Sequence, residues 1–385
     1  MTLWTVIPRD PLIFRDGRPF NADSGARAKS LPFPFPSTLA GAARTSGAGQ
    51  ADFKSDALIQ KLLNESLRGP LLVELDEKEE ISEILFPAPA DALLLKDEND
   101  PQKAHRIYLN PIELDETVVT DLEGLHIVAP SQAVKGKPHR LAPRYWRKDF
   151  YEEWLIEPNN GEISLKELGH QGPSFESRMH VRIDEKTNTG VDGALFQTSG
   201  LEFVHRETEE TEDFPQLSKS KKMALALKSD SNIQEGMFFL GGERRVAKWK
   251  KSEKDFPSYP PKLKEKILQD KACRLILLTP AYFKQGYLPE FLQKKYDVEL
   301  VGTAVPRHQV VSGWDYKKRV PKPTRKLVPA GSVYFLKING DPQKILNELW
   351  FENISDGEQN RRDGFGLALL GSWSGKLGRL EVNRE

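Results

Sequence analysis

Apolar residues in the C-terminal third of the chain form nearly unbroken runs, which predict buried strands at 273–279, 298–305, 331–338 and 364–373. A short helix that begins with a proline is expected at 289–295. A second helix is expected to have Asp341 as its N-cap and Pro342 at its first position. With 308–314 as the hairpin partner of the second strand, the order is β-α-β-β-α-β, which is typical of a ferredoxin-like or RRM-like domain with an open sheet face.

The first half of the chain is compatible with a second domain of this kind. Strands are predicted at 3–7 and 70–75, and helical segments open at Ser37 as N-cap and continue at 58–67. Prolines between 85 and 173 predict a long insertion in place of a compact core. Residues 256–262 have the composition of a linker. We therefore expect an α+β fold with two ferredoxin-like (RRM-like) domains, at 1–255 and 256–385, that carry long insertions.

Length and cysteine content are compatible with this division. At 385 residues the chain exceeds the usual size of a single core, which favours two domains. The single cysteine, Cys273, excludes a disulfide framework within the chain and favours a reducing compartment. The first residues do not resemble a secretory leader, and the sequence holds no run of roughly eighteen apolar residues. We expect a cytoplasmic protein that does not span a membrane.

Positive and negative charges balance overall, at 56 residues each, but they are segregated along the chain. Basic runs lie at 135–148, 244–254 and 317–326. The first includes Tyr145 and Trp146, and basic side chains mixed with aromatic rings suit single-stranded nucleic acid. Acids gather at 74–83 and 207–213, and we interpret them as solvated loops or helix faces. Solvated surface is the simpler explanation for any single basic run, whereas three such runs favour binding.

Two arginine motifs carry candidate binding chemistry. In DPLIFRDGRPF, at 10–20, an Asp-Gly turn on an apolar base fixes Arg15 and Arg18, which suits a phosphate or carboxylate ligand. The same arginines can equally hold Asp10 or Asp16. In SRMHVRID, strand geometry places alternate side chains on one face at intervals of about 6.6 Å, comparable with a nucleotide step. Those side chains are Arg178, His180 and Arg182, and a solvated strand face explains them equally well.

Glycine-containing segments form a third kind of motif. In GFGLALLG, the glycines at 364, 366 and 371 let the backbone of a ligand approach closely, although a tight turn between helix and strand is an equal alternative. In GGERR, at 241–245, a hairpin turn is the first explanation, and a contact to RNA or to another subunit is the second.

The chain resembles a family of CRISPR proteins through an ordered set of segments: DPLIFRDGRPF, PSTLAGAAR, RMHVRID with GALFQT, FFLGGERR, LILLTPAYFKQGYLP, SGWDY with PAGSVYF, and GFGLALLG. These segments resemble the Cmr-type subunit of the RAMP superfamily that pairs with the large polymerase-and-nuclease subunit of type III-B CRISPR complexes. The resemblance spans nearly the whole chain and implies two RRM-like domains without catalytic residues. It also implies a ribonucleoprotein subunit of antiviral defence that holds the 5′ tag of the guide crRNA. Its protein partners would be the neighbouring backbone RAMP subunit and the large subunit.

Candidate RNA contacts follow because fixed guanidiniums suit phosphate oxygens, and glycines permit close approach of a backbone. They are Arg15, Arg18, Arg27, Arg44, Lys135, Lys137, Arg140, Arg178, His180, Arg182, Arg244, Arg245, Arg307, Trp314, Gly364, Gly366 and Gly371. Trp314 would stack on a base, although a place in the core is its simpler explanation.

We expect no catalytic residue, no metal and no cofactor. The seven histidines show no metal-ligand spacing, and the sequence has no Walker loop, nucleophile elbow or His-Asp pair. The alternative is a metal-independent RAMP endoribonuclease that processes guide RNA. In that case His180, between two arginines, would be the general base.

Overall fold

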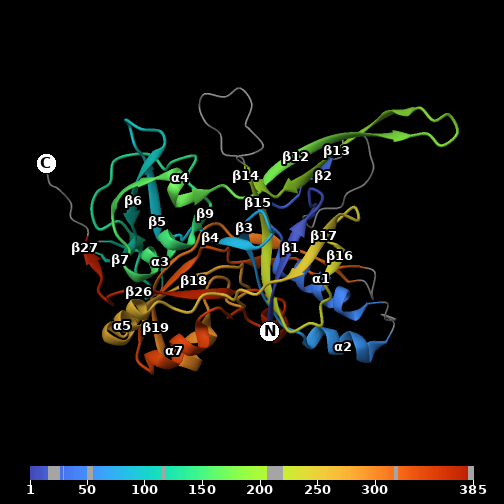
Figure 1. Cartoon of the computed structure of the whole chain (residues 1–385). Coiled ribbons are helices and arrows are strands. Elements are labelled where there is room, and N and C mark those ends of the chain that lie inside the picture. Colours follow the sequence, from blue (N-terminus) through green and yellow to red (C-terminus); the bar gives the residue numbers. More distant parts are fainter. Residues whose placement is uncertain are drawn as a thin grey trace.

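The computed structural model describes residues 1–15, 27–28, 30–49, 55–114, 118–122, 124–205, 220–315 and 320–379. Two main sheets, both antiparallel, are combined with short helices and several two- and three-stranded sheets (Figure 1). No helix in the described ranges is long and apolar enough to cross a membrane.

The larger sheet has nine strands in the order β11-β9-β4-β3-β15-β1-β17-β16, with β14 paired to β15 beyond this path. Its strands are β1 (Thr2–Pro8), β3 (Leu67–Leu75), β4 (Ile81–Pro87), β9 (Tyr145–Arg147), β11 (Gly169–His170), β14 (Val204–His205), β15 (Lys221–Ser229), β16 (Gly236–Phe239) and β17 (Val246–Lys251). The strands predicted at 3–7 and 70–75 are confirmed as parts of β1 and β3.

The second main sheet has five strands in the order β19-β24-β18-β26-β25. The strands are β18 (Ala272–Leu277), β19 (Val298–Ala304), β24 (Val333–Ile338), β25 (Glu352–Asn353) and β26 (Leu367–Ser372), and the helices of this part are α5 (Pro261–Asp270), α6 (Glu290–Tyr296), α7 (Pro342–Leu349) and α8 (Glu358–Arg362). All four predicted strands are present. The predicted cap of α7 is confirmed, because the Asp341 carboxylate accepts the backbone N–H of Gln343 at 2.9 Å.

Two local predictions were wrong. Residues 308–314 do not form a hairpin with β19, because Pro306 follows that strand and cannot donate a ladder hydrogen bond. Instead β20 (Gln309–Val311) pairs with β23 (Arg325–Leu327), and β21 (Trp314–Asp315) pairs with β22 (Val320–Pro321). Ser37 is not an N-cap, because α1 (Pro36–Ala48) begins with a proline and its cap is Phe35. The helix predicted at 58–67 is shorter, α2 (Asp56–Asn64).

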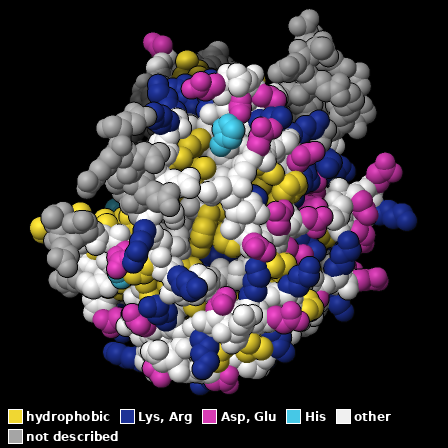
Figure 2. Space-filling view, turned by 90° about the vertical axis from the view of Figure 1, so that its left-hand side faces the viewer, with side chains coloured by type: hydrophobic (Ala, Val, Ile, Leu, Met, Phe, Trp, Pro, Cys, Tyr) yellow, Lys and Arg dark blue, Asp and Glu magenta, His cyan; other side chains and the backbone are white. Residues whose placement is uncertain are grey.

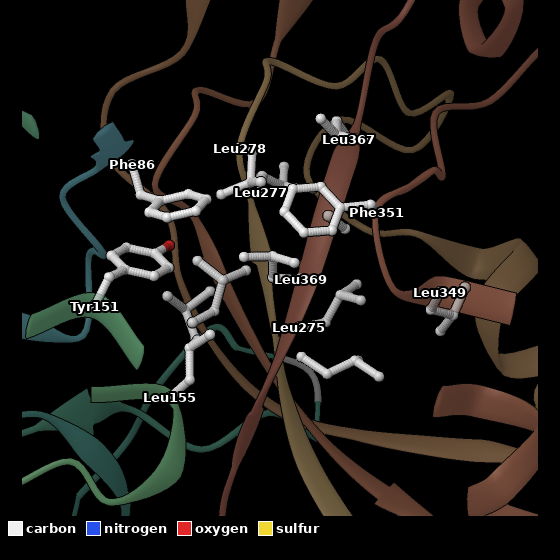
Figure 3. Packing of buried hydrophobic residues seen from close by; sticks show 14 of the residues in the cluster. Phe86, Tyr151, Leu155, Leu275, Leu277, Leu278, Leu349, Phe351, Leu367 and Leu369 are labelled. Atoms are coloured by element: carbon white, nitrogen blue, oxygen red, sulfur yellow. The ribbon is translucent and has the colours of Figure 1, made fainter. Parts of the chain in front are cut away.

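The proline-rich region at 85–173 is part of the core, contrary to the prediction that it takes the place of a compact core. It contributes β9 and β11 to the larger sheet, and α3 (Lys148–Ile156) to the space between the two sheets. Figure 3 shows Phe86, Tyr151 and Leu155 of this region beside the strands of the second sheet that carry Leu275 and Leu369. Large apolar side chains lie between the prolines, and their burial stabilises the core. The positions of the prolines in the sequence do not predict this burial.

The same region contains five further short strands and one short helix. They are β5 (Ala92–Lys96), β6 (Lys103–Tyr108) and β10 (Gly161–Ser164), which form one sheet, and β7 (Asn110–Glu113), β8 (Val128–Ala129) and α4 (Leu165–Leu168). Strand β27 (Gly378–Arg379) pairs with β7, so the end of the described chain returns to this region.

The second sheet has no open face, contrary to the prediction. Every residue of β18 and of β26 is buried. Helices α5 and α7 pack near these strands, and Arg274 of β18 points the other way, to Trp154 of α3. One continuous cluster of buried residues, which includes Leu3 and Leu71 of the larger sheet and Leu275 of the second, joins the two predicted domains. The boundary between residues 255 and 256 stays a prediction.

Candidate nucleic-acid interface

Strands β12 (Ser174–Ile183) and β13 (Gly190–Glu202) form a long hairpin that projects from the body of the molecule (Figure 1). The turn is organised by Asp184, whose carboxylate accepts the N–H groups of Lys186 and Thr187 at 2.9 Å each. Near the middle of β13, strand β2 (Arg27–Ala28) adds a short parallel pairing. The strand predicted for SRMHVRID is therefore confirmed.

One face of this hairpin carries Arg178, His180 and Arg182, as the alternation predicts. The His180 ring stacks on Phe196 of β13, with ring centroids 5.1 Å apart and planes at 16°, and its Nε2 lies 2.8 Å from Thr198 Oγ1. Arg178 Nε lies 2.6 Å from Glu176, and Arg182 is exposed. The imidazole is thus held in place between two guanidiniums that both reach solvent.

The opposite face of the hairpin is apolar and open to solvent. Its side chains are between 43% and 67% exposed: Phe175, Met179, Val181, Ile183 and Leu195. Exposed apolar surfaces of this kind are typical of binding surfaces. The alternation is visible in the sequence, but only the structure shows that these side chains are left uncovered.

The base of the hairpin meets two other predicted motifs. Leu12 and Leu201 exchange backbone hydrogen bonds of 2.9 and 2.7 Å, which join the segment before Arg15 to β13. The Gly242 N–H donates to the Ile13 carbonyl at 2.7 Å, so the GGERR turn between β16 and β17 reaches the same place. A set of sequence-distant basic segments therefore surrounds the hairpin base.

Within this set, Arg15 forms an ion pair with Glu243 rather than with Asp10, whose carboxylate accepts the Val246 N–H at 3.2 Å. Glu243 and Arg244 have left-handed backbone angles, with φ of 58° and 52°. Such φ values in residues other than glycine are uncommon and concentrate at functional positions. Arg18 lies outside the described residues, and for Arg27 the structure describes only the backbone.

Arg44 is an internal residue, which does not support its predicted contact to RNA. Only 8% of it is exposed. Its Nη1 lies 2.6 Å from the Asp363 carboxylate, and its Nη2 donates to the Glu65 carbonyl at 2.7 Å. The guanidinium therefore fastens α1 to the loop that precedes Gly364.

The three glycines of GFGLALLG are required by internal packing, and two of them, Gly364 and Gly366, lie in the predicted turn between helix and strand. A Cβ on Gly364 would lie 2.6 Å from the Gly69 carbonyl oxygen, and one on Gly366 would lie 2.7 Å from the Ser355 nitrogen. A Cβ on Gly371 would lie 2.8 Å from Nη2 of Arg274. All three glycines are buried, so the close approach that they permit is to the protein's own chain.

The basic run at 135–148 divides into an exposed loop and a buried strand. Lys135, Lys137 and Arg140 are exposed, on a loop anchored by His139, whose N–H donates to the Leu94 carbonyl at 2.8 Å. Trp146, by contrast, is only 1% exposed and belongs to the core, so the predicted mixing of cations with free aromatic rings is wrong there. Figure 1 shows β5 and β6, next to this loop, on the other side of the molecule from the hairpin.

The acidic run at 74–83 was predicted to be solvated, and this holds only for part of it: Asp76 and Glu77 are exposed at the turn, whereas other acids of the run pair with cations. Glu79 contacts Lys248 at 2.6 Å and Arg9 at 3.1 Å, and Glu80 pairs with Lys250. Lys248 and Lys250 of the basic run at 244–254 are therefore neutralised by the turn between β3 and β4. Figure 2 shows basic and acidic side chains similarly interspersed over another face.

Glu74, in the same acidic run, is a buried carboxylate. Its side chain is 2% exposed and lies 3.1 Å from Arg147, 3.2 Å from Lys221 and 3.3 Å from His170. Burial by itself raises the pKa of Glu74, but the contact with His170 and the charges of Arg147 and Lys221 outweigh burial and lower that pKa to about 2.

The last two candidates lie on the short strands after β19. Arg307 is exposed in the loop between β19 and β20. Trp314 lies in β21, and only its backbone is described. Neither is linked by a described contact to the hairpin base.

The antiparallel sheets and the projecting hairpin define a protein of mixed helices and strands, and its hairpin has one cationic and one apolar face. A family model described as CRISPR-associated protein (Cas_Cmr3) matches residues 4–373. The chain therefore belongs to the Cas_Cmr3 family of CRISPR-associated proteins, as the sequence resemblance implied.

Solved structures show distant likenesses to this chain. A chain of the type III-B Cmr-beta complex bound to cognate target RNA and AMPPnP shares 16% identity with this chain, with a TM-score of 0.46. A chain of the same type of complex bound to cognate target RNA shares 17% identity, with a TM-score of 0.44. Each match covers 86% of this chain and 86% of the other. A chain of the Csm3–Csm4 subcomplex of a type III-A complex shares 11% identity, covers 89% of this chain and 94% of its own, and has a TM-score of 0.33. No curated protein matches the chain significantly. Likenesses this distant carry no argument about function, and the family match alone supports the assignment.

Proposed function

We propose that this protein is a non-catalytic RNA-binding subunit of a type III-B CRISPR ribonucleoprotein. It holds the 5′ tag of the guide crRNA, contacts the neighbouring backbone RAMP subunit and docks the large polymerase-and-nuclease subunit. Membership in the Cas_Cmr3 family supports the CRISPR context. The observation that carries the RNA-binding role is the two-faced hairpin, with cations on one side and uncovered apolar side chains on the other.

The chemistry of single-stranded RNA fits these two faces. Phosphates carry the charge of the strand, and Arg178 and Arg182 reach solvent from alternate positions of β12, about 13 Å apart along the strand from a rise near 3.3 Å per residue. Unstacked bases present apolar faces, which can lie against side chains such as Met179 and Leu195. The guanidinium of Arg15 lies at the hairpin base, where Glu243 balances its charge.

The loop with Lys135, Lys137 and Arg140 is a second candidate contact to RNA. In the described residues these cations form no ion pair, and they face solvent. Because the loop lies away from the hairpin, the two surfaces would bind different stretches of an RNA strand.

We infer further that the two main sheets are two ferredoxin-like units. In both, four strands follow the spatial order second, third, first, fourth: β19-β24-β18-β26 in one, and β3-β15-β1-β17 in the other. In the first, α6 and α7 are the crossover helices. In the second, α1 and α2 form the first crossover. Strand β16 lies between β15 and β17 in the sequence, at the position of the second crossover helix.

A binding role without catalysis is also part of the proposal. His180 donates to or accepts from Thr198 and stacks on Phe196, so its ring has a structural role in the hairpin. To act as a general base, His180 would need a substrate hydroxyl within hydrogen-bond reach of its Nε2, the atom that contacts Thr198.

A salt titration of RNA binding tests the role of the hairpin. Replacing Arg178 and Arg182 together by Ala should weaken binding of a 5′-tagged guide RNA and make the log–log salt slope shallower by about 1.4, since each phosphate contact to a single strand contributes about 0.7. The matched control replaces Lys294 and Arg379, two exposed cations elsewhere, and should change neither quantity. An unchanged slope in the hairpin variant, with its fold intact, would place the RNA contacts elsewhere.

A further inference from the structure

The edge of the larger sheet at β16 is open. In the described part of the chain, β16 pairs with β17 alone. The Leu240 N–H donates to the Arg245 carbonyl at 2.8 Å, and bonded and non-bonded pairs alternate along an antiparallel ladder. Phe238 is therefore bonded to β17, whereas the N–H and C=O groups of Met237 and Phe239 point away from the sheet. This edge offers two donors and two acceptors in the geometry of a strand.

Side chains along this edge are apolar and exposed. Met237 is 53% exposed and Phe239 is 65% exposed, while Phe238, between them, packs against the core on the other face. Natural proteins usually protect an open edge with lysine, proline or a bulge. The sequence GMFF has neither lysine nor proline, and its pairing with β17 is regular. The edge is therefore not protected against an added strand.

Charge at one end of the edge is unbalanced. Arg244 is exposed and has no ion pair in the described ranges, and the Nε of Arg245 is buried with no hydrogen-bond partner there. The adjacent acid, Glu243, is bound to Arg15. An acidic side chain brought to this end would complement two guanidiniums, one of which already bears the cost of burial.

We propose that the outer edge of β16 receives an extended segment of a companion protein subunit, which adds a strand to the larger sheet. The segment carries apolar side chains that cover Met237 and Phe239 and an acidic side chain that faces Arg244 and Arg245. The inference rests on the proposed place of this protein in a multi-subunit complex.

The chemistry of the edge favours a polypeptide over RNA as the occupant. An RNA strand can accept from outward N–H groups through its phosphates and can donate to outward carbonyls through its 2′-hydroxyls, but it brings a charged phosphate with every nucleotide, which does not suit an edge lined by exposed apolar side chains. A polypeptide strand satisfies both groups at once. Because β16 has only four residues, the added strand makes few hydrogen bonds, so it acts as one part of a larger subunit interface.

Amide hydrogen exchange of the full chain tests the proposal. The chain is measured alone, with guide RNA alone, and after assembly with the large subunit and the neighbouring backbone subunit. We expect the amides of Met237 and Phe239 to exchange at least about tenfold more slowly only in the protein assembly, since exchange reports local opening. Protection by guide RNA alone, or protection that grows with the concentration of the isolated chain, would replace the companion subunit by RNA or by a second copy and overturn the proposal.

Two variants separate this inference from the proposed function. Phe239→Lys places a charge on the open edge and should weaken assembly by about tenfold or more. Val310→Lys, at an apolar residue of similar exposure (51%) on β20, should not. If the wild-type proteins assemble but these variants behave alike, or the two amides keep their exchange rates, the edge proposal is wrong and the proposed function stands. If the wild-type chain assembles with neither companion, both are wrong.

Discussion

Replacing Asp91 by asparagine removes a buried charge while keeping the size of the side chain. Arg274 and Asp91 both have fully buried side chains, and Nη1 of Arg274 lies 2.5 Å from Asp91 Oδ2. The guanidinium also donates to the carbonyls of Trp154 and Ser372, and the indole N–H of Trp154 donates to Asp91 at 3.0 Å. This network fastens α3 and the segment after β4 to the middle of the second sheet.

The expected loss of stability follows from the burial. Removing one partner of a buried ion pair leaves an uncompensated charge, which typically costs about 3–5 kcal/mol. In Asp91→Asn the carbonyls of Trp154 and Ser372 still accept hydrogen bonds from Arg274, so we expect a loss near the lower end, about 3 kcal/mol. That is a large fraction of the roughly 5–15 kcal/mol that stabilises a typical domain.

Urea denaturation followed by tryptophan fluorescence measures this loss. Asp91→Asn should lower the unfolding midpoint clearly. The double variant Asp91→Leu with Arg274→Met should lose less than the sum of the two single variants, because it leaves no buried charge. A loss below about 1 kcal/mol in Asp91→Asn is the value for an exposed pair, and it would refute the reasoning that this pair is desolvated.

Three further predictions concern the buried Gly371, the buried carboxylate of Glu74 and the imidazole of His180. Gly371→Ala should destabilise the protein by about 1–3 kcal/mol, because the added Cβ would lie 2.8 Å from Arg274. The control Gly41→Ala in α1, where a Cβ would have nothing within 4 Å, should be neutral or stabilising. Equal unfolding midpoints of the two variants in urea would contradict this. The depressed pKa of Glu74 adds stability above its unfolded value of about 4.3 that is lost as the pH falls toward about 2, so Glu74→Gln should flatten the acid limb of a pH–stability profile; an unchanged limb would show that other groups dominate it. His180→Ala should leave target RNA cleavage by the assembled complex unaltered, and loss of cutting with intact assembly would favour the endoribonuclease alternative.

Local patterns predicted many elements of this fold because their causes are local. The cap at Asp341 and the alternation through Arg178, His180 and Arg182 depend only on neighbouring residues, and both were predicted correctly. The region at 85–173 was misjudged because its prolines are visible along the chain, while the burial of Trp146 and Trp154 depends on a sheet formed by residues beyond 270.

The candidate site also has features that follow from the sequence and features that depend on the folded chain. Basic residues could be found in the sequence, but their availability depends on the acids that the fold places beside them. Arg44 meets Asp363, and Lys248 meets Glu79, across separations of 319 and 169 residues. The open edge at β16 had no signal in the sequence, because an edge is defined by the strand that is absent beside it.

For this protein, the order of residues alone determined the family resemblance, the main strands of the second sheet and the two chemical faces of the hairpin. The tertiary structure decided which cations remain accessible, which glycines serve internal packing and which surfaces stay uncovered. The physical reason is that strand propensity and side-chain alternation act over a few residues, whereas burial and ion pairing arise between segments that meet only in the folded chain.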